Sequence, residues 1–226
     1  MMAGFSDEKR AYIRSELLDT GRKLFARYGL KKTTISDLTD PVGIADGTFY
    51  HFFDSKERLY LEILTREQEA FADSVDELLA DASGPQEGIT AYLRLTIEEI
   101  ETNPLIQQLV VEDDWERLVQ EFSGDELAEQ REQELGYLLP YVRAWQEDGQ
   151  LIDGDPRAIT GAINAAAFVA LHREEFGDDL YPAVRDTLVE SVASGLTTDS
   201  KPTPSTSETR ADEEQPQSTR DERSTR

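Results

Sequence analysis

Apolar residues recur every three or four positions along most of the first 196 residues, and this helical period constrains the fold more than any other feature. The alternation of apolar and polar residues that favours strands is weak throughout, and no internal repeat is visible. Glycine and proline residues interrupt the helical period at intervals. The sequence therefore predicts an all-α fold of about nine helices.

The interruptions place the ends of the predicted helices. Gly29 ends the first helix, Thr33 or Thr34 caps a short second helix, and Pro41 and Gly43 break that helix. Besides the short second helix, the predicted helices span about 7–28, 45–52, 56–80, 85–101, 103–122, 123–147, 156–176 and 180–196.

Two short helices, joined by a turn that contains glycine and preceded by a long helix, are typical of a helix-turn-helix. We place this motif at residues 34–53. Its second helix, at 45–52, is small enough to enter the major groove of DNA with its first residues facing the base edges.

The residues of this motif resemble the DNA-binding domain of the TetR family. The similarity is carried by the segments Leu24–Gly29, Thr33–Leu38 and Gly43–Glu57, and it covers residues 11–71 closely. For residues 72–197 the resemblance implies only a common architecture, a helical domain for ligand binding and dimerisation.

The resemblance implies which residues approach DNA. Thr33 and Thr34 would offer hydroxyls to phosphate, Gly47 would let the backbone come close, and Lys56 would bind a phosphate. The full implied set is Thr33, Thr34, Ala45, Asp46, Gly47, Thr48, Tyr50, His51 and Lys56. Residues implied to hold the domain together are Ile35, Leu38, Ile44, Phe49, Phe52 and Phe53.

Three of the implied contacts have plainer alternatives. Tyr50 can be an ordinary core aromatic, His51 a solvated bystander and Lys56 a surface lysine.

Three residues depart from the family pattern. Ala45 stands where a capping serine is usual, which removes about 1 kcal/mol of helix stabilisation unless another group replaces it. Asp46 occupies a position that is often basic; its carboxylate suits the helix dipole but repels phosphate, and it can instead accept a cytosine amino hydrogen. Pro41 lies inside what is normally an unbroken helical turn. These departures concern base reading rather than the fold.

Aromatic residues of the C-terminal helices suggest a binding cavity. Trp115, Tyr141 and Trp145 are the predicted ligand-binding residues, because small effectors bind in apolar cavities lined by aromatic side chains. The alternative is that these residues are ordinary core. The effector itself is a small molecule that the sequence does not identify.

Small residues mark a predicted contact between two copies of the chain. Gly161, Ala162, Ala165 and Ala166 permit close helix approach, and the resemblance implies a homodimer through helices at about 157–175 and 180–196. An isolated buried helix is the alternative.

The net charge of −24 is unevenly distributed. Residues 1–65 hold ten Lys or Arg and ten Asp or Glu, so residues 66–226 carry the whole excess. One interpretation is that acidic surface merely aids solubility. We favour adaptation to high intracellular salt, because the chain is rich in Asp and Glu, has only six lysines and uses arginine instead.

Composition excludes several other classes of protein. Cysteine is absent and only His51 and His172 are present, so we expect no enzyme, no metal and no cofactor. No apolar stretch is long enough for a membrane, which predicts a cytoplasmic protein. Residues 198–226 are polar and acidic and are expected to form a disordered tail.

The predicted function is a ligand-responsive transcriptional repressor that binds double-stranded operator DNA as a dimer. The alternative is an acidic helical interaction protein that has lost DNA binding, which the net charge and Asp46 would favour.

Overall fold

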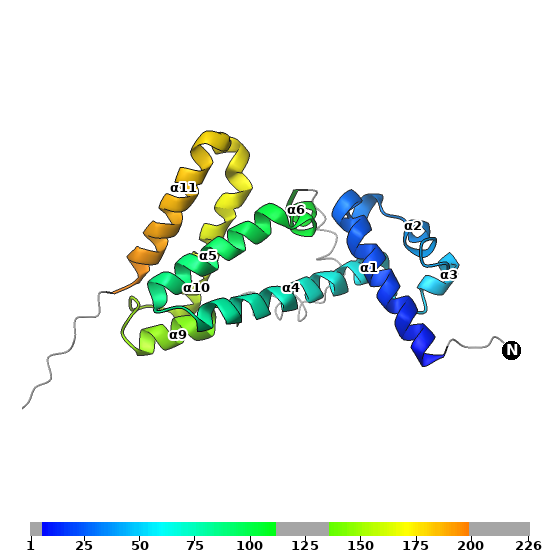
Figure 1. Cartoon of the computed structure of the whole chain (residues 1–226), viewed down its shortest axis with the longest axis horizontal. Coiled ribbons are helices and arrows are strands. Elements are labelled where there is room, and N and C mark those ends of the chain that lie inside the picture. The colour runs from blue at the N-terminus through cyan, green and yellow to red at the C-terminus, as the bar shows by residue number, and fades with distance from the viewer. Residues whose placement is uncertain (1–5, 112–135, 199–226) are drawn as a thin grey trace, which may run out of the picture.

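The computed structural model describes residues 6–111 and 136–198, and every regular element within them is helical (Figure 1). In chain order these elements are α1 (Asp7–Lys32), α2 (Ile35–Thr39), α3 (Asp46–Phe49), α4 (Lys56–Ala80), α5 (Pro85–Thr102), α6 (Pro104–Val111), α9 (Leu139–Glu147), α10 (Pro156–Ala167), the 3₁₀ helix η1 (Phe168–His172) and α11 (Arg173–Leu196). Extended residues pair only once in these two ranges, as an isolated bridge between Leu151 and Thr197. The all-α prediction is confirmed.

Helix ends follow the glycines and caps of the sequence. Gly29 has φ 74°, so α1 breaks there and only a short further turn reaches Lys32. Gly43 has φ 73° in the turn after α2, a left-handed conformation that glycine adopts at no steric cost. At the start of α4, the Ser55 hydroxyl accepts a hydrogen bond from the Arg58 amide at 3.1 Å.

The first of two hydrophobic clusters lies in an N-terminal unit, termed the head, formed by α1, α2, α3 and the first half of α4. Its buried residues are Ile13, Leu17, Leu18, Phe25, Leu30, Leu38, Phe49, Phe53, Leu59, Tyr60, Ile63, Leu64 and Leu105. Leu105 comes from α6, and the Tyr60 hydroxyl donates to its carbonyl at 3.3 Å. The first turn of α6 is thus part of the head, although it lies far beyond residue 71 in the chain.

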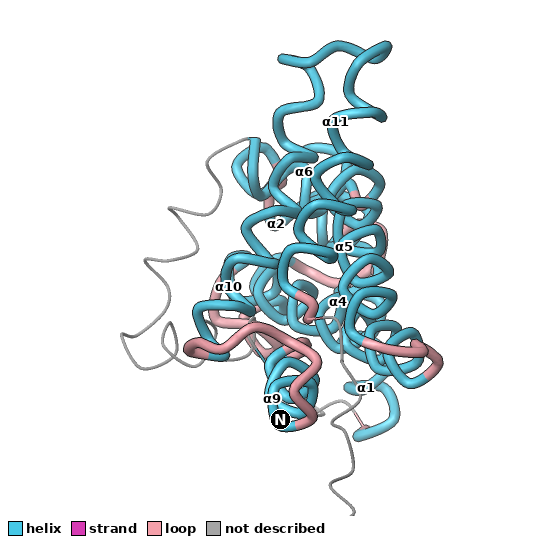
Figure 2. The backbone as a smooth tube through the Cα atoms, turned by 90° about the vertical axis from the view of Figure 1, so that its left-hand side faces the viewer, coloured by secondary structure: helices cyan, strands magenta, loops and turns pink. Residues whose placement is uncertain are grey.

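The second cluster lies in the body, formed by the end of α4 with α5, α9, α10, η1 and α11. Figure 1 shows α4 running from the head into the body with α5 alongside it. Gly177, with φ 74°, breaks the helix near the start of α11, so that α10, η1 and α11 form a hairpin. Figure 2 shows this hairpin projecting beyond the other helices.

Two predicted helices differ from the structure. The helix predicted over 156–176 is α-helical at Pro156–Ala167, becomes the 3₁₀ helix η1 at Phe168–His172, and is α-helical again from Arg173. The spacing of apolar residues does not distinguish 3₁₀ from α-helical hydrogen bonding. Within the predicted helix at 123–147, a turn at Tyr137 and Leu138 precedes α9, because Pro140 in its first turn has no N–H to continue an earlier helix. Residues 112–135, with Trp115, and the predicted tail beyond Thr198 lie outside the described residues.

No helix in the described part of the chain is long and apolar enough to cross a membrane.

Candidate nucleic-acid interface and ligand cavity

The start of α2 is fixed by a reciprocal pair of side chains. The Thr34 hydroxyl accepts from the Asp37 amide at 3.2 Å, while the Asp37 carboxylate accepts from the Thr34 amide at 2.9 Å and from its hydroxyl at 2.6 Å. These bonds hold the pKa of Asp37 below its usual range. Thr34 therefore caps α2, and its hydroxyl is already engaged within the motif.

Asp46 connects α3 to α2. One oxygen of its carboxylate accepts from the Ser36 hydroxyl and the other from the Thr39 hydroxyl, both at 2.6 Å. Hydrogen bonds from Ser36 and then Thr39 lower the pKa of Asp46, so the carboxylate is ionised near neutral pH. Ala45, the N-cap of α3, makes no side-chain cap bond. The Asp46 carboxylate is therefore directed toward α2.

Thr33 and Lys56 both donate hydrogen bonds to backbone carbonyls around the end of α1. Thr33 is buried, and its hydroxyl donates to the Gly29 carbonyl at 2.8 Å. The Lys56 ammonium donates to the carbonyls of Leu30 at 2.7 Å and of Thr33 at 2.8 Å. Lys56 thus joins the start of α4 to the end of α1, and of its three N–H groups one remains for another acceptor.

The remaining predicted contacts face outward. Ala45, Gly47 and His51 are exposed, and Thr48 is half-buried. Tyr50 is 57% exposed and meets the buried Phe49 edge-on, with ring centroids 5.5 Å apart. An exposed fraction this large rules out the alternative of Tyr50 as a core aromatic.

The helical hydrogen bonding of α3 changes after Phe49. The His51 amide donates to the Thr48 carbonyl at 3.1 Å, and the Phe52 amide donates to the Phe49 carbonyl at 2.9 Å. These i to i+3 bonds tighten the last turn, so the predicted helix over 45–52 is an α-helix only at residues 46–49. The tightened turn carries Tyr50 and His51 on the outer side of the motif.

The implied head residues lie where the resemblance places them. Leu38, Phe49 and Phe53 are buried in the head cluster, and Ile35, Ile44 and Phe52 pack against it. Arg10 from α1 closes the end of the motif by donating to the His51 carbonyl at 3.1 Å.

A cavity of about 330 Å³ lies between α4, α5, α6 and α10. Its walls are mostly apolar, and its polar lining includes Glu67, Glu99 and a hydrogen bond from the Tyr92 hydroxyl to Asn164 Oδ1 at 2.8 Å. Burial raises the pKa of Tyr92 to about 12, so its hydroxyl stays protonated. The aromatic lining residues are Phe71, Tyr92, Tyr137 and Phe168.

Tyr141 and Trp145 do not line this cavity. Their rings lie 6.0 Å apart, the Tyr141 hydroxyl donates to Asp76 at 3.1 Å, and Trp145 packs so closely on Gly88 that a Cβ there would approach it to 2.9 Å. Sequence spacing does not single out the cavity residues, because they come from α4, α5, α6, α10, η1 and the turn at Tyr137 and share no motif. Trp115 cannot be placed, since it lies outside the described residues.

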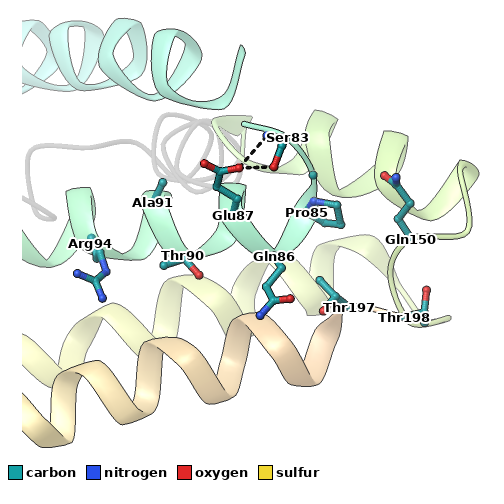
Figure 3. A pocket seen from close by; sticks show the side chains of 11 residues that line it. Ser83, Pro85, Gln86, Glu87, Thr90, Ala91, Arg94, Gln150, Thr197 and Thr198 are labelled. Carbon is teal, nitrogen blue, oxygen red and sulfur yellow. Dashed lines mark hydrogen bonds between the residues drawn. The ribbon is translucent and has the colours of Figure 1, made fainter. Parts of the chain in front are cut away.

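A second, larger cleft of about 590 Å³ lies at the start of α5 (Figure 3). Its lining includes the polar residues Gln86, Thr90 and Arg94 of α5 together with Gln150 and Thr197. No group of three or more metal-binding side chains occurs anywhere in residues 6–111 and 136–198.

Comparison with known proteins places this geometry among transcriptional regulators. Residues 17–63 match the family described as bacterial regulatory proteins, tetR family. The chain is 33% identical over 117 residues to the transcriptional repressor KstR2 of Mycolicibacterium smegmatis, covering 52% of this chain and 57% of that protein. The chain spans about half the length of the curated relatives it matches.

Solved structures share the fold over more of the chain. A TetR-family regulator from Pectobacterium atrosepticum has a TM-score of 0.64 at 22% identity and covers 86% of this chain and 99% of that chain. The ketosteroid transcriptional regulator KstR2 of Mycobacterium tuberculosis has a TM-score of 0.56 at 23% identity, covering 88% of this chain and all of that one. At these identities the likeness establishes the fold.

Proposed function

This chain belongs to the TetR family of transcriptional regulators, and we propose that it is a homodimeric repressor that releases operator DNA when a small molecule occupies the body cavity. The observation that carries the DNA-binding part is the outward face of the α2–α3 motif. There, exposed residues stand on a short helix whose opposite side is fixed in the head core.

We assign the surface of this motif to the operator. Gly47 allows close approach, and Thr48, Tyr50 and His51 contact phosphates or base edges. Lys31 and Lys32, exposed at the end of α1, add positive charge beside the start of α2. This charge favours the approach of phosphate.

The remaining predicted contacts receive different roles in this proposal. Thr33 and Thr34 shape the motif with hydroxyls that are bonded internally, and Asp46 positions α3. Lys56 binds the end of α1 and offers its remaining N–H to phosphate.

A second copy of the chain is proposed to cover the α10–α11 hairpin. Phe168, Leu171, Phe176 and Leu180 expose large apolar side chains there, between 38% and 55% of their surface. Ala162 and Ala165 on α10 are exposed as well, which permits close helix approach. A patch of this kind is a typical protein contact surface.

The DNA-binding proposal is tested by selecting duplexes from a random pool with the full-length chain and measuring mobility shifts across KCl concentrations. We expect one enriched palindromic sequence, whose binding weakens steeply as salt rises. Tyr50→Ala should weaken binding at least tenfold, while Tyr141→Ala in the body should not. Failure to enrich any duplex, even at low salt, would favour the alternative of an interaction protein without DNA binding.

The dimer is tested by light scattering during size-exclusion chromatography. We expect twice the mass of one chain, and about the mass of one chain for Leu180→Glu, because a charge in an apolar contact is poorly solvated. Glu190→Gln, an exposed change on the same helix, is the control. A monomeric wild-type chain would contradict the dimer.

A further inference from the structure

We propose that the cavity selects an apolar ligand whose polar end is uncharged or cationic and donates hydrogen bonds to Glu67 and Glu99. Such a ligand competes for these carboxylates with Arg22 and Asn103, which now hold them. The inference rests on the proposed function only in treating this cavity as the effector site.

The charge of the cavity wall carries the selectivity. The described residues that line it include two carboxylates, Glu67 and Glu99, and no lysine or arginine. Hydrogen bonding to Arg22 holds the pKa of Glu67 below its ordinary value, so this group is ionised near neutral pH. Arg22 balances the charge of Glu67, and the Glu99 carboxylate leaves the wall with an excess of negative charge. An anionic ligand end would therefore meet negative charge in partly desolvated surroundings, where like charges repel more strongly than in water.

The other walls are apolar. Leu61, Leu64, Ile100, Ile106 and Leu109 surround the space together with the aromatic rings. Burial of an apolar ligand body against them is favourable in proportion to the area removed from water. The cavity therefore suits a molecule with an apolar body and one hydrogen-bond-donating end.

The two carboxylates also tie the head to the body. Glu67 on α4 accepts from Arg22 Nε at 2.8 Å and from Arg22 Nη2 at 3.1 Å, and Arg22 belongs to α1. Asn103 Nδ2 donates to Glu67 at 3.0 Å and to Glu99 at 2.5 Å. A residue that lines the cavity is thus bonded directly to the helix that supports the DNA-binding motif.

Asn103 extends the connection to α6. It is buried, and its Oδ1 accepts from the Leu105 amide at 3.0 Å, at the point where α6 enters the head core. A ligand donor that takes up Glu67 or Glu99 oxygens draws them from Arg22 and Asn103. Because a ligand shifts an equilibrium only through its different affinities for two states, this competition provides such a difference.

Three probes with the same chain length separate the ligand classes: decan-1-ol, decylamine and decanoate, each kept below the concentration at which it forms micelles. Calorimetric titration of the full-length protein should show decan-1-ol and decylamine binding at least tenfold more tightly than decanoate. Decan-1-ol is the decisive probe, because decylamine is also attracted by the overall negative charge of the protein. Equal or tighter binding of decanoate, or no binding of any probe, would overturn the proposal.

Substitutions of Glu67 and Glu99 test whether these two carboxylates cause the preference for decan-1-ol over decanoate. Glu67→Gln and Glu99→Gln should each reduce the ratio of decan-1-ol affinity to decanoate affinity at least threefold. Glu98→Gln, an exposed change on α5 that removes the same charge outside the cavity lining, should leave it unchanged. An unchanged preference in both cavity variants would place the selectivity elsewhere.

A further titration tests the competition between the ligand and Arg22 for Glu67. Arg22→Gln should raise the affinity for decan-1-ol at least threefold, because Glu67 loses its strongest partner, while Arg27→Gln on the same helix should not. Unchanged affinity in Arg22→Gln would refute the competition. These titrations contain no DNA, so their failure and a failure to bind operator are separate outcomes.

Discussion

At the scale of single residues, Asp46 offsets the loss of a cap at Ala45. Ala45 leaves the first amides of α3 without a side-chain partner, and Asp46 instead bonds the helix sideways to Ser36 and Thr39. Both bonds are between α3 and α2, so they fix the angle between the two helices of the motif. A residue that looks unfavourable beside phosphate thereby becomes a positioning residue.

Substitution of Asp46 separates this role from its charge. Asp46→Ala should weaken operator binding several-fold, because α3 is no longer held against α2. Asp46→Asn should reduce operator affinity less, because its amide oxygen still accepts one hydrogen bond. Asp40→Ala is the matched control: it removes an exposed charge from the same motif and should leave binding equal or tighter. Mobility shifts at fixed KCl measure the effect. An Asp46→Ala protein that binds as well as Asp40→Ala would show that the carboxylate acts only as a repulsive charge.

The sequence predicted which residues belong to the motif better than what each one contacts. Leu38 and Phe49 are buried as the pattern indicated, and Tyr50 is exposed. Thr33 and Lys56, by contrast, bond to carbonyls near the end of α1. Those bonds depend on the left-handed turn at Gly29 and on where α4 begins in space, and residue spacing specifies neither.

At the scale of elements, the glycine and proline residues of the sequence predicted the ends of helices better than they predicted the type of helix. Gly29, Pro41 with Gly43, and Pro156 all stand at boundaries in the structure. The change from α10 to η1 at Phe168 has no such signal. The choice between i to i+3 and i to i+4 bonding depends on tertiary packing, which the pattern of a single helix does not contain.

The insertion of α6 into the head predicts a long-range effect on stability. Leu105 is fully buried in the head cluster, so Leu105→Ala should lower the free energy of unfolding by about 2–5 kcal/mol, the range for buried leucine truncations. Leu180→Ala, which truncates an exposed leucine, should have a much smaller effect on the monomer. Urea unfolding measures both. A small change for Leu105→Ala would mean that α6 does not stabilise the head.

The contact between α1 and α4 predicts a dependence on pH. The folded pKa of Glu67 is lowered, chiefly by its hydrogen bond to Arg22, so the unfolded chain binds the proton more readily. The stabilisation is therefore complete above the unfolded pKa of about 4.3 and is lost as the pH falls through the lower folded value. The difference in unfolding free energy between wild type and Glu67→Gln should therefore be constant near neutral pH and shrink as the pH falls below about 5. A difference that is constant with pH would contradict this assignment.

At the scale of the whole molecule, the net charge differs between the head and the rest of the chain. Residues 1–65, which form most of the head, balance ten basic against ten acidic residues, while the rest of the chain carries the net −24. A neutral head can approach phosphate without the repulsion that the body would impose. The proposed operator face thus lies on the one part of the chain whose charges cancel.

The same distribution predicts how the protein responds to salt. Repulsion among exposed carboxylates of the body destabilises the compact state in dilute buffer, and at molar ionic strength the screening length falls to about 3 Å, which removes most of it. The melting temperature should therefore rise as KCl increases from dilute to molar, whereas operator affinity falls over the same range. If the neutral head is what permits binding in concentrated KCl, Lys31→Glu with Lys32→Glu should abolish operator binding there and change the melting temperature little. A melting temperature that fails to rise with KCl would count against adaptation to high salt and leave solubility as the reason for the acidic body.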